Sequence, residues 1–586
     1  MSKRLARFLT LLLALIISFS LIQSAPVQAE EPVYDQQVLI IHYQDRDQLA
    51  DLANRYDVVE VDSETQTVKI FSNQITRDAL TAEGVGWIVD QAYTAEINTV
   101  VKPLPGQISG IPGFPCYRTI AEVFDAADGL AENYPDLAEI KDIGDSWEKT
   151  ENANAGWDME VLLLTNRTNS EPKSDAFIMS GIHAREWAPP ELMLRMAEYL
   201  LENYETDADV KWLLDYNRIH LVLLTNPDGR LQDEANTSWL WRKNTNNNYC
   251  TGGTGSEGRG ADLNRNFPFA WEGAGYQCSE TYPGASAGSE PETQAITAYV
   301  SSVFPDQRGP NPTDPVNELT ATGMFIDMHS YSELVLWPWG YTGTPAPNDA
   351  SLRAMSYKFA YYNGYTPKQS VALYPTEGTT DDWAYGELGL PGFCFELGTS
   401  FHQGCSAFES EIYPDNQEAL IRAIKIARKP YRLTHGPEVT NLSAYVNPGG
   451  LVVNYSADDT FYSTYSGGVP SSNIMSIRYS IDKPSWIAGA NPKTVELRTT
   501  VPKYSGMFSV NLDGLAPGQH TLFVEALDNS GAWGPPTAIF FEVEGEVTPT
   551  PPTPTPPTPT PPTPTPPPDP EQTIYLPLIR REQIAP

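Results

Sequence analysis

Residues 176–190 read Ala176-Phe-Ile-Met-Ser-Gly-Ile-His-Ala-Arg-Glu-Trp-Ala-Pro-Pro190. The stretch begins with an apolar run that lacks polar alternation, as expected for a central strand covered on both faces. The paired prolines at its end favour a helix start, because proline is tolerated in the first helical turn. The stretch therefore predicts a strand, a loop and a helix of an open α/β sheet. Such sheets hold their ligands at the carboxyl ends of the strands.

The predicted loop carries His183 and Glu186, and a second motif, Asp327-Met-His-Ser-Tyr331, adds His329. Two imidazoles and one carboxylate are typical of a catalytic zinc site, which keeps its fourth position open for water. By itself, His-x-x-Glu near a helix start also arises by chance. The two motifs together predict one Zn²⁺ bound by His183, Glu186 and His329.

Similar apolar runs recur through the central part of the chain, at residues 160–164, 219–224, 324–327 and 392–395. They alternate with segments of helical spacing, so residues 112–435 are predicted to form one α/β domain. We expect a mixed, mostly parallel sheet with helices on both faces.

Further motifs lie in the same region: Trp241-Arg-Lys243, Asp262-Leu-Asn-Arg-Asn266, Cys278-Ser-Glu-Thr-Tyr282, Tyr374, Asp382-Trp383 and Phe393-Cys-Phe-Glu-Leu397. In this order they resemble the zinc metallocarboxypeptidases of the pancreatic carboxypeptidase A/B type, and the secreted bacterial branch most of all. The resemblance covers residues 112–435. It implies the zinc carboxypeptidase fold, and removal of single residues from the C-termini of peptides or proteins.

The resemblance also implies two catalytic side chains. Glu396 matches the glutamate that takes a proton from the zinc-activated water, and it ends an apolar segment in which a carboxylate has no packing role. Arg242 matches the arginine that stabilises the oxyanion, a role suited to a preorganised charge. A structural alternative for Glu396 is a buried ion pair with an arginine.

Six further side chains are implied to bind substrate: Arg185, Asn264, Arg265, Tyr331, Tyr374 and Asp381. Arginine suits a terminal carboxylate because its planar fork matches two oxygens. Each arginine alone could equally serve a surface ion pair. Tyr374 matches the tyrosine that closes over the substrate.

Asp381 bears on specificity. Tyr374 and Glu396 lie 22 positions apart, as in the family. In that frame Asp381 matches the pocket-floor aspartate of the branch that prefers basic C-terminal residues, so we expect basic or mixed specificity. Gln369 is expected on another pocket wall. The alternative is that Asp381 turns outward.

Residues 37–90 show a β-α-β-β-α-β pattern, which is the split βαβ arrangement. A turn-rich segment, residues 91–115, follows. At this place the resemblance implies an activation propeptide, assigned to residues 30–111. An ordinary accessory domain is the alternative.

The first 29 residues read as a signal peptide, with basic residues, an apolar run and a small-residue cleavage site. A membrane anchor is the alternative, but the run is short and interrupted. No later stretch reaches the roughly 20 apolar residues that a spanning helix needs. We therefore expect a secreted protein, and a monomer.

Beyond His435 short alternating segments predict an immunoglobulin-like or fibronectin-like β-sandwich at residues 436–547. Residues 548–570 repeat Thr and Pro, typical of an extended stalk, and residues 571–586 form a tail. Stalk and tail together suggest cell-surface attachment. A frayed terminus is the alternative for the tail.

The net charge of −36 argues against nucleic acid or anionic lipid as a partner. Export permits disulfides among the five cysteines. The resemblance pairs Cys250 with Cys278, while Cys116, Cys394 and Cys405 leave the choice of a second bridge open. Two other functions stay open: an enzyme of this fold that acts on cell-wall peptides, and an inactive member used for surface binding.

Overall fold

The computed structural model describes residues 36–99, 102–235, 240–250, 258–273, 275–309, 311 and 313–544. The expected signal peptide, stalk and tail lie outside these residues. Within the described part of the chain, no helix is both long enough and apolar enough to cross a membrane.

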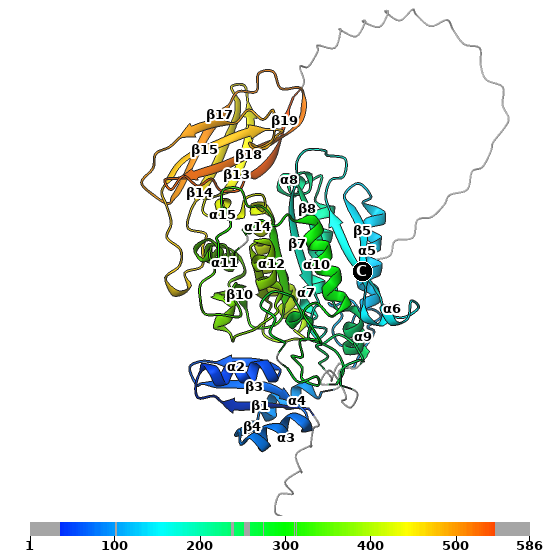
Figure 1. Ribbon diagram of the computed structural model, residues 1–586. Coiled ribbons are helices and arrows are strands. Elements are labelled where there is room, and N and C mark those ends of the chain that lie inside the picture. Colours follow the sequence, from blue (N-terminus) through cyan, green and yellow to red (C-terminus); the bar gives the residue numbers. More distant parts are fainter. Residues whose placement is uncertain are drawn as a thin grey trace, which may run out of the picture. The chain divides into compact units, whose positions relative to one another are not determined.

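An antiparallel sheet of four strands opens the described chain (blue in Figure 1), in the order β2-β3-β1-β4. Two of its helices begin at side-chain caps, because Asp45 accepts from the Gln48 amide and Asn73 from the Thr76 amide. The β-α-β-β-α-β prediction is confirmed. The prediction of a turn-rich segment from residue 91 is wrong at its start, because residues 91–97 form helix α4. We call the elements up to α4 the N-terminal unit. Its elements are β1 (Gln37–His42), α2 (Arg46–Arg55), β2 (Val58–Asp62), β3 (Thr67–Ser72), α3 (Gln74–Glu83), β4 (Trp87–Val89) and α4 (Gln91–Ile97).

The central sheet has eight strands in the order β11-β10-β12-β9-β7-β8-β6-β5. Its middle strands β12, β9, β7 and β8 run parallel, and both flanks add antiparallel pairs. The sheet is therefore mixed, as predicted. Its strands are β5 (Ala138–Asp145), β6 (Asp158–Leu164), β7 (Ser174–Ser180), β8 (Asn217–Val222), β9 (Met324–His329), β10 (Leu334–Trp337), β11 (Thr366–Gln369) and β12 (Gly392–Glu396).

Helices cover both faces of this sheet (Figure 1). Strand β7 shows why, since its side chains alternate between two apolar clusters. Ala176 and Ile178 pack with α7 and α14, whereas Phe177 and Met179 pack with α10 and α12. The main helices are α5 (Ile120–Asn133), α7 (Ala188–Glu202), α8 (Ala208–Tyr216), α9 (Pro227–Ala235), α10 (Pro291–Val303), α11 (Asp349–Asn363), α12 (Thr380–Leu388) and α14 (Tyr413–Ile426).

Shorter helical turns complete this part of the chain: α6 (Trp147–Glu151), η1 (Leu263–Arg265), η2 (Ser370–Ala372), α13 (Cys405–Ala407), η3 (Phe408–Ile412) and α15 (Pro430–Leu433).

Two packed sheets follow, which confirms the predicted β-sandwich. Alternate residues of the facing strands, such as Leu451 and Val453 against Ile477 and Val524, fill the space between the sheets. One sheet has the order β13-β14-β17, the other β16-β15-β18-β19. The strands are β13 (Glu438–Asn447), β14 (Gly450–Asp458), β15 (Ile474–Ile481), β16 (Lys493–Glu496), β17 (Lys503–Val510), β18 (Gly518–Asp528) and β19 (Thr537–Val543), with the short turn η4 (Tyr465–Gly467).

The disulfides answer the question that the sequence left open. Cys250 pairs with Cys278 as the resemblance implied, and Cys116 pairs with Cys405 across 289 residues. Cys394 is a free, buried thiol on β12.

Candidate metal centre and the surrounding cleft

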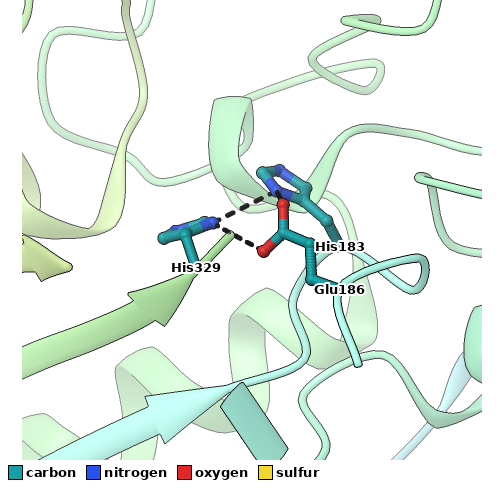
Figure 2. A group of neighbouring side chains, drawn as sticks. All are labelled: His183, Glu186 and His329. Atoms are coloured by element: carbon teal, nitrogen blue, oxygen red, sulfur yellow. Dashed lines mark hydrogen bonds and ion pairs between the residues drawn. The ribbon is translucent and has the colours of Figure 1, made fainter. Parts of the chain in front are cut away.

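His183, Glu186 and His329 meet at one edge of the central sheet (Figure 2). Strands β7 and β9 are parallel neighbours, so their carboxyl ends lie side by side. The loop after β7 carries His183 and Glu186, and His329 is the last residue of β9. The fold thus brings together residues that are 146 positions apart in the sequence.

The geometry of the three side chains fits a tetrahedral zinc site. His183 Nδ1 lies 2.8 Å from Glu186 Oε1 and 3.2 Å from His329 Nδ1, which itself lies 3.2 Å from Glu186 Oε2. Ligand bonds of about 2.0–2.1 Å in a tetrahedron put neighbouring ligand atoms about 3.3 Å apart. Two imidazole nitrogens that face each other at this distance suit a shared cation, and the donor set therefore fits zinc.

Two buried aspartates hold the imidazoles from behind. His183 Nε2 lies 3.2 Å from Asp262 Oδ1, and His329 Nε2 lies 2.8 Å from Asp327 Oδ2. A carboxylate on the outer nitrogen fixes the tautomer and leaves the inner nitrogen free to bind a metal. The sequence analysis assigned these aspartates no role. For Asp327 the available signal was its position two residues before His329 on β9, because residues i and i+2 of a strand share a face. Asp262 caps the helical turn η1, and no sequence spacing pointed to its contact with His183.

Glu396 ends β12 beside the metal centre. In the parallel pairing of β12 with β9 it is the register partner of His329. Burial raises its pKa to about 8; the charge on Glu186 adds to this effect, while those on His329 and Arg242 oppose it. A carboxyl group with a pKa near neutrality is suited to accept and return a proton.

Arg242 and the segment that carries Asn264 and Arg265 form the next wall. Nε and Nη2 of Arg242 both donate to Asp262 Oδ2, at 3.1 and 2.8 Å. Asn264 Nδ2 lies 3.2 Å from His329 Nε2, and its Oδ1 accepts from the Thr380 amide. Arg265 Nη1 donates to the Asn264 carbonyl oxygen at 2.7 Å. The arginines are thus fixed in place beside the metal centre.

Arg185 is occupied by the N-terminal unit. Nη1 and Nη2 donate to the two carboxylate oxygens of Asp57, at 2.5 and 2.9 Å. Both side chains are about 1% exposed. The guanidinium carbon also lies 4.1 Å from the ring centroid of Phe401 and 5.1 Å from that of Phe71. The Asp57 carboxylate of the same chain thus pairs with Arg185, which the sequence analysis predicted to bind substrate.

The two tyrosines of the cleft also contact the N-terminal unit. Tyr331 shares a hydrogen bond of 2.8 Å with the hydroxyl of Tyr93 on α4. Tyr374 packs against the apolar core of that unit, together with Val58 and Val61. Burial raises the pKa of the Tyr374 hydroxyl. Side chains expected to meet substrate are therefore held by the first part of the chain.

Asp381 faces the cleft, and its neighbour Asp382 does not. Asp381 accepts from the hydroxyls of Ser370 and Thr379, at 2.7 and 2.8 Å. The Asp382 carboxylate instead accepts from the amides of Gly340 and Tyr341. The expectation for Gln369 is wrong, because its amide donates to the carbonyl oxygens of Trp339 and Thr342. It lies on β11 between two cleft residues, and a strand turns successive side chains to opposite sides.

These groups line a single cavity of about 440 Å³, which we call the cleft. Residues 58–61 of β2 also line it, so the N-terminal unit forms part of its wall. All the side chains predicted as catalytic, substrate-binding or metal-binding lie around it: His183, Arg185, Glu186, Arg242, Asn264, Arg265, His329, Tyr331, Tyr374, Asp381 and Glu396.

Comparison with known proteins agrees with this site. The family model described as zinc carboxypeptidase matches residues 123–422. Carboxypeptidase A1 of Sus scrofa is 30% identical over 323 residues, which cover 53% of this chain and 69% of the relative. Carboxypeptidase O of Bos taurus is 27% identical over 390 residues, 63% of this chain and 95% of the relative. The chain belongs to the zinc carboxypeptidase family and is a metallocarboxypeptidase.

Solved structures support the fold. The carboxypeptidase A of Helicoverpa armigera superposes with a TM-score of 0.51 at 19% identity and covers 68% of this chain and 97% of its own. Thrombin activatable fibrinolysis inhibitor gives 0.50 at 22% identity, with 67% and 99% covered. The prediction of a zinc carboxypeptidase fold is confirmed.

Proposed function

We propose that this protein removes single residues from the free C-termini of peptides and proteins, with one zinc ion held by His183, Glu186 and His329. The convergence of these three groups with Glu396 and Arg265 in one cleft carries the proposal. A zinc ion in such a site supplies a Lewis acid that polarises a carbonyl group and activates water.

The chain's own residues perform the remaining steps. Glu396 takes the proton of the attacking water and passes it to the leaving amine, a role supported by its position beside His329 and its raised pKa. Arg242 stabilises the negative charge that develops on the carbonyl oxygen. Asp262 fixes both Arg242 and His183, so one buried carboxylate aligns the oxyanion partner with the metal centre.

Recognition of the chain end falls to Asn264, Arg265 and Arg185. A planar guanidinium can bind a terminal carboxylate through two parallel hydrogen bonds. The pair of Asp57 with Arg185 is an internal example of that interaction in the same cleft. Tyr374 and Tyr331 then cover the bound residue.

Asp381 selects the side chain of the departing residue. It faces the cleft and keeps lone pairs beyond the two hydroxyls that it accepts from. A carboxylate in this position favours Lys or Arg, so we propose basic or mixed specificity.

The N-terminal unit keeps the enzyme latent as a propeptide, residues 30–111. Its strand β2 lines the cleft, Asp57 occupies Arg185, and Tyr93 holds Tyr331. The chain has no cysteine before Cys116, so cleavage after this unit leaves only non-covalent contacts. We further propose a secreted monomer of the bacterial branch, with the stalk and tail as a surface attachment.

One assay tests the proposal. Purified unprocessed and processed protein are incubated with a peptide that has a free C-terminus and with its C-terminally amidated form, with and without a chelator. We expect processed protein to release amino acids only from the free C-terminus, and only while metal is bound. Release from the amidated peptide, or release that survives complete metal removal, would contradict the proposal. Equal rates of amino-acid release by the unprocessed and processed forms would exclude only the proposed latency and would leave the proposed activity standing.

A further inference from the structure

Residues 102–109, which precede the buried Ile111, are largely open to solvent. Residues 102–106 and 108–109 are exposed, and the side chain of Ile108 is 97% exposed. We call residues 102–109 the connector. Exposed segments of this kind are preferred sites of proteolytic cleavage.

The connector offers little to an endopeptidase that selects basic residues. Its one basic residue is Lys102, and Pro103 follows it. The ring nitrogen of proline has no N–H and fixes the backbone, so a Lys–Pro bond is a poor substrate for trypsin-like enzymes. The nearest arginines are protected: Arg77 is 7% exposed within α3, and Arg118 is bonded to Glu191 through both its amide and its guanidinium.

The chain is firmly anchored directly after the connector. Ile111 is fully buried, and its amide donates to the Tyr117 carbonyl oxygen at 2.8 Å. The Gly110 amide donates to the carboxylate of Glu122, and Cys116 is tied to Cys405. A cut within the connector would therefore leave the following domain intact, with its new N-terminus in place.

We propose that the connector is cut at Ile108, by an endopeptidase that selects a branched apolar side chain and not a basic one. The cut hydrolyses the peptide bond on one side of Ile108; it consumes one water molecule and leaves a new carboxylate and a new amino group. The inference rests on the proposed latency of the N-terminal unit, because it names the class of protease that would relieve it.

Gln107 controls access to this bond. Its Oε1 accepts from the amides of Leu104 and Gly113, at 3.0 and 2.9 Å. Its Nε2 donates to the carbonyl oxygens of Ser109 and Ile111, at 3.0 and 2.8 Å. Proteases bind their substrates in an extended form, so this clamp must open before cleavage. Loss of the Gln107 amide is expected to speed the cut.

The test uses the full, unprocessed chain with three endopeptidases as probes: trypsin, subtilisin and thermolysin. Time courses are read by intact mass and by the N-terminal sequence of the large product, and peptidase activity is followed in parallel. Subtilisin is expected to give an N-terminus at Ser109 and thermolysin one at Ile108. Trypsin is expected to leave the connector uncut.

Three variants sharpen the result. Ile108→Asp should slow the cut about 10- to 100-fold, because a protease pocket loses a buried apolar side chain. Gln107→Ala should speed it about tenfold through loss of the clamp. Lys102→Ala is the matched control, and subtilisin and thermolysin should cleave it at Ile108 at the native rate.

Cleavage by trypsin after Lys102 at a rate equal to that of subtilisin would overturn the proposal, as would first cuts that map outside residues 107–109. A cut at Ile108 without any rise in activity would uphold this site and would instead refute the latency of the N-terminal unit.

Discussion

The two domains that flank the catalytic part are attached in different ways. The N-terminal unit has its own apolar core and contacts the catalytic part in two ways. Polar pairs join Asp57 to Arg185, Tyr93 to Tyr331, and the Asn54 carbonyl oxygen to Thr281. A small separate apolar cluster joins Val38, Val59, Phe71 and Ile97 to Leu240 and Phe401. The sandwich instead joins the main core of the catalytic part. Tyr462, Ile487, Phe523 and Ala538 belong to the same apolar cluster as α7 and α14.

Buried ion pairs reinforce the shared core. Glu438, at the start of β13, accepts from Lys358 of α11 and Arg422 of α14, each at 3.0 Å. Both Lys358 and Glu438 are about 1% exposed. Polar pairs and a small apolar cluster expose little apolar surface when they separate, whereas opening the main core would expose far more, at a cost that grows with the apolar area. This difference indicates that the N-terminal unit can dissociate after cleavage, whereas the sandwich remains attached to the catalytic part.

The largest expected effect concerns the catalytic part that lies between the two flanking domains in the sequence. His329→Ala should abolish bound metal and activity together in the processed protein. Glu396→Gln should retain the metal and lower turnover by about 10² to 10⁴, because only the proton acceptor is lost. Metal content by elemental analysis and kcat separate the two outcomes. Full turnover in Glu396→Gln would contradict the assignment of Glu396 as the general base.

The second prediction tests the shared core. Glu438→Ala leaves the buried Lys358 without its carboxylate partner and should cost about 3–5 kcal/mol in the free energy of unfolding. Denaturant unfolding of processed protein measures this loss. A change below 1 kcal/mol would show that the sandwich is only loosely docked.

The same contact predicts a pH dependence. Burial favours the neutral form of Glu438, but Lys358 and Arg422 outweigh it, so the pKa of this carboxyl group is lowered in the folded protein. Its stabilising effect is therefore complete above the unfolded pKa of about 4.5 and is lost as the pH falls through the lower folded value. Glu438→Gln should flatten the acid side of the stability curve. An unchanged slope would contradict the assignment.

The third prediction concerns the N-terminal unit. Asp57→Ala removes the partner of buried Arg185, so the unprocessed chain should gain activity about 10- to 100-fold as the unit loosens. Hydrolysis by uncleaved protein is the measurement, with the processed form, which lacks residue 57, as the control. Burial alone would raise the pKa of the Asp57 carboxyl group, but the charge and hydrogen bonds of Arg185 outweigh burial, so the pKa is lowered. Native unprocessed protein that is held near pH 4 and assayed after return to neutral pH should therefore still be latent, and activation by such mild acid would contradict this.

A fourth, smaller effect is expected at Asp381. Asp381→Ala should lower kcat/KM for C-terminal Arg and Lys by roughly tenfold to 100-fold, the range of a charge-assisted hydrogen bond. Peptides that end in Leu should be cleaved as well as before or better. Equal loss for basic and apolar residues would make Asp381 a structural residue, tied to Ser370 and Thr379.

The smallest effect is expected at the rim of the sandwich. Lys483 pairs with Glu171 at 2.7 Å, and the two side chains are 43% and 29% exposed. Exposed pairs of this kind contribute about 0.2–1 kcal/mol. Lys483→Ala should therefore shift the unfolding free energy little, in contrast to Glu438→Ala. A loss of unfolding free energy as large as that in Glu438→Ala would show that exposed and buried ion pairs contribute equally to the stability of the sandwich.

The sequence by itself determined the local elements and the residue types of the cleft. Hydrophobic spacing and caps act over a few residues, so the β-α-β-β-α-β unit, the strand and helix around His183, and the sandwich strands could be predicted. The candidate metal ligands could be named because motif and spacing carry their chemistry directly.

Only the tertiary structure decided which distant groups meet. Asp57 reaches Arg185 across 128 residues, and Cys116 reaches Cys405 across 289. Asp262 and Asp327 acquire roles only when the sheet edge turns them toward two imidazoles. Gln369 faces away because of the side that β11 presents to the cleft. Contacts of this kind depend on the packing of whole elements, which short-range sequence patterns do not specify.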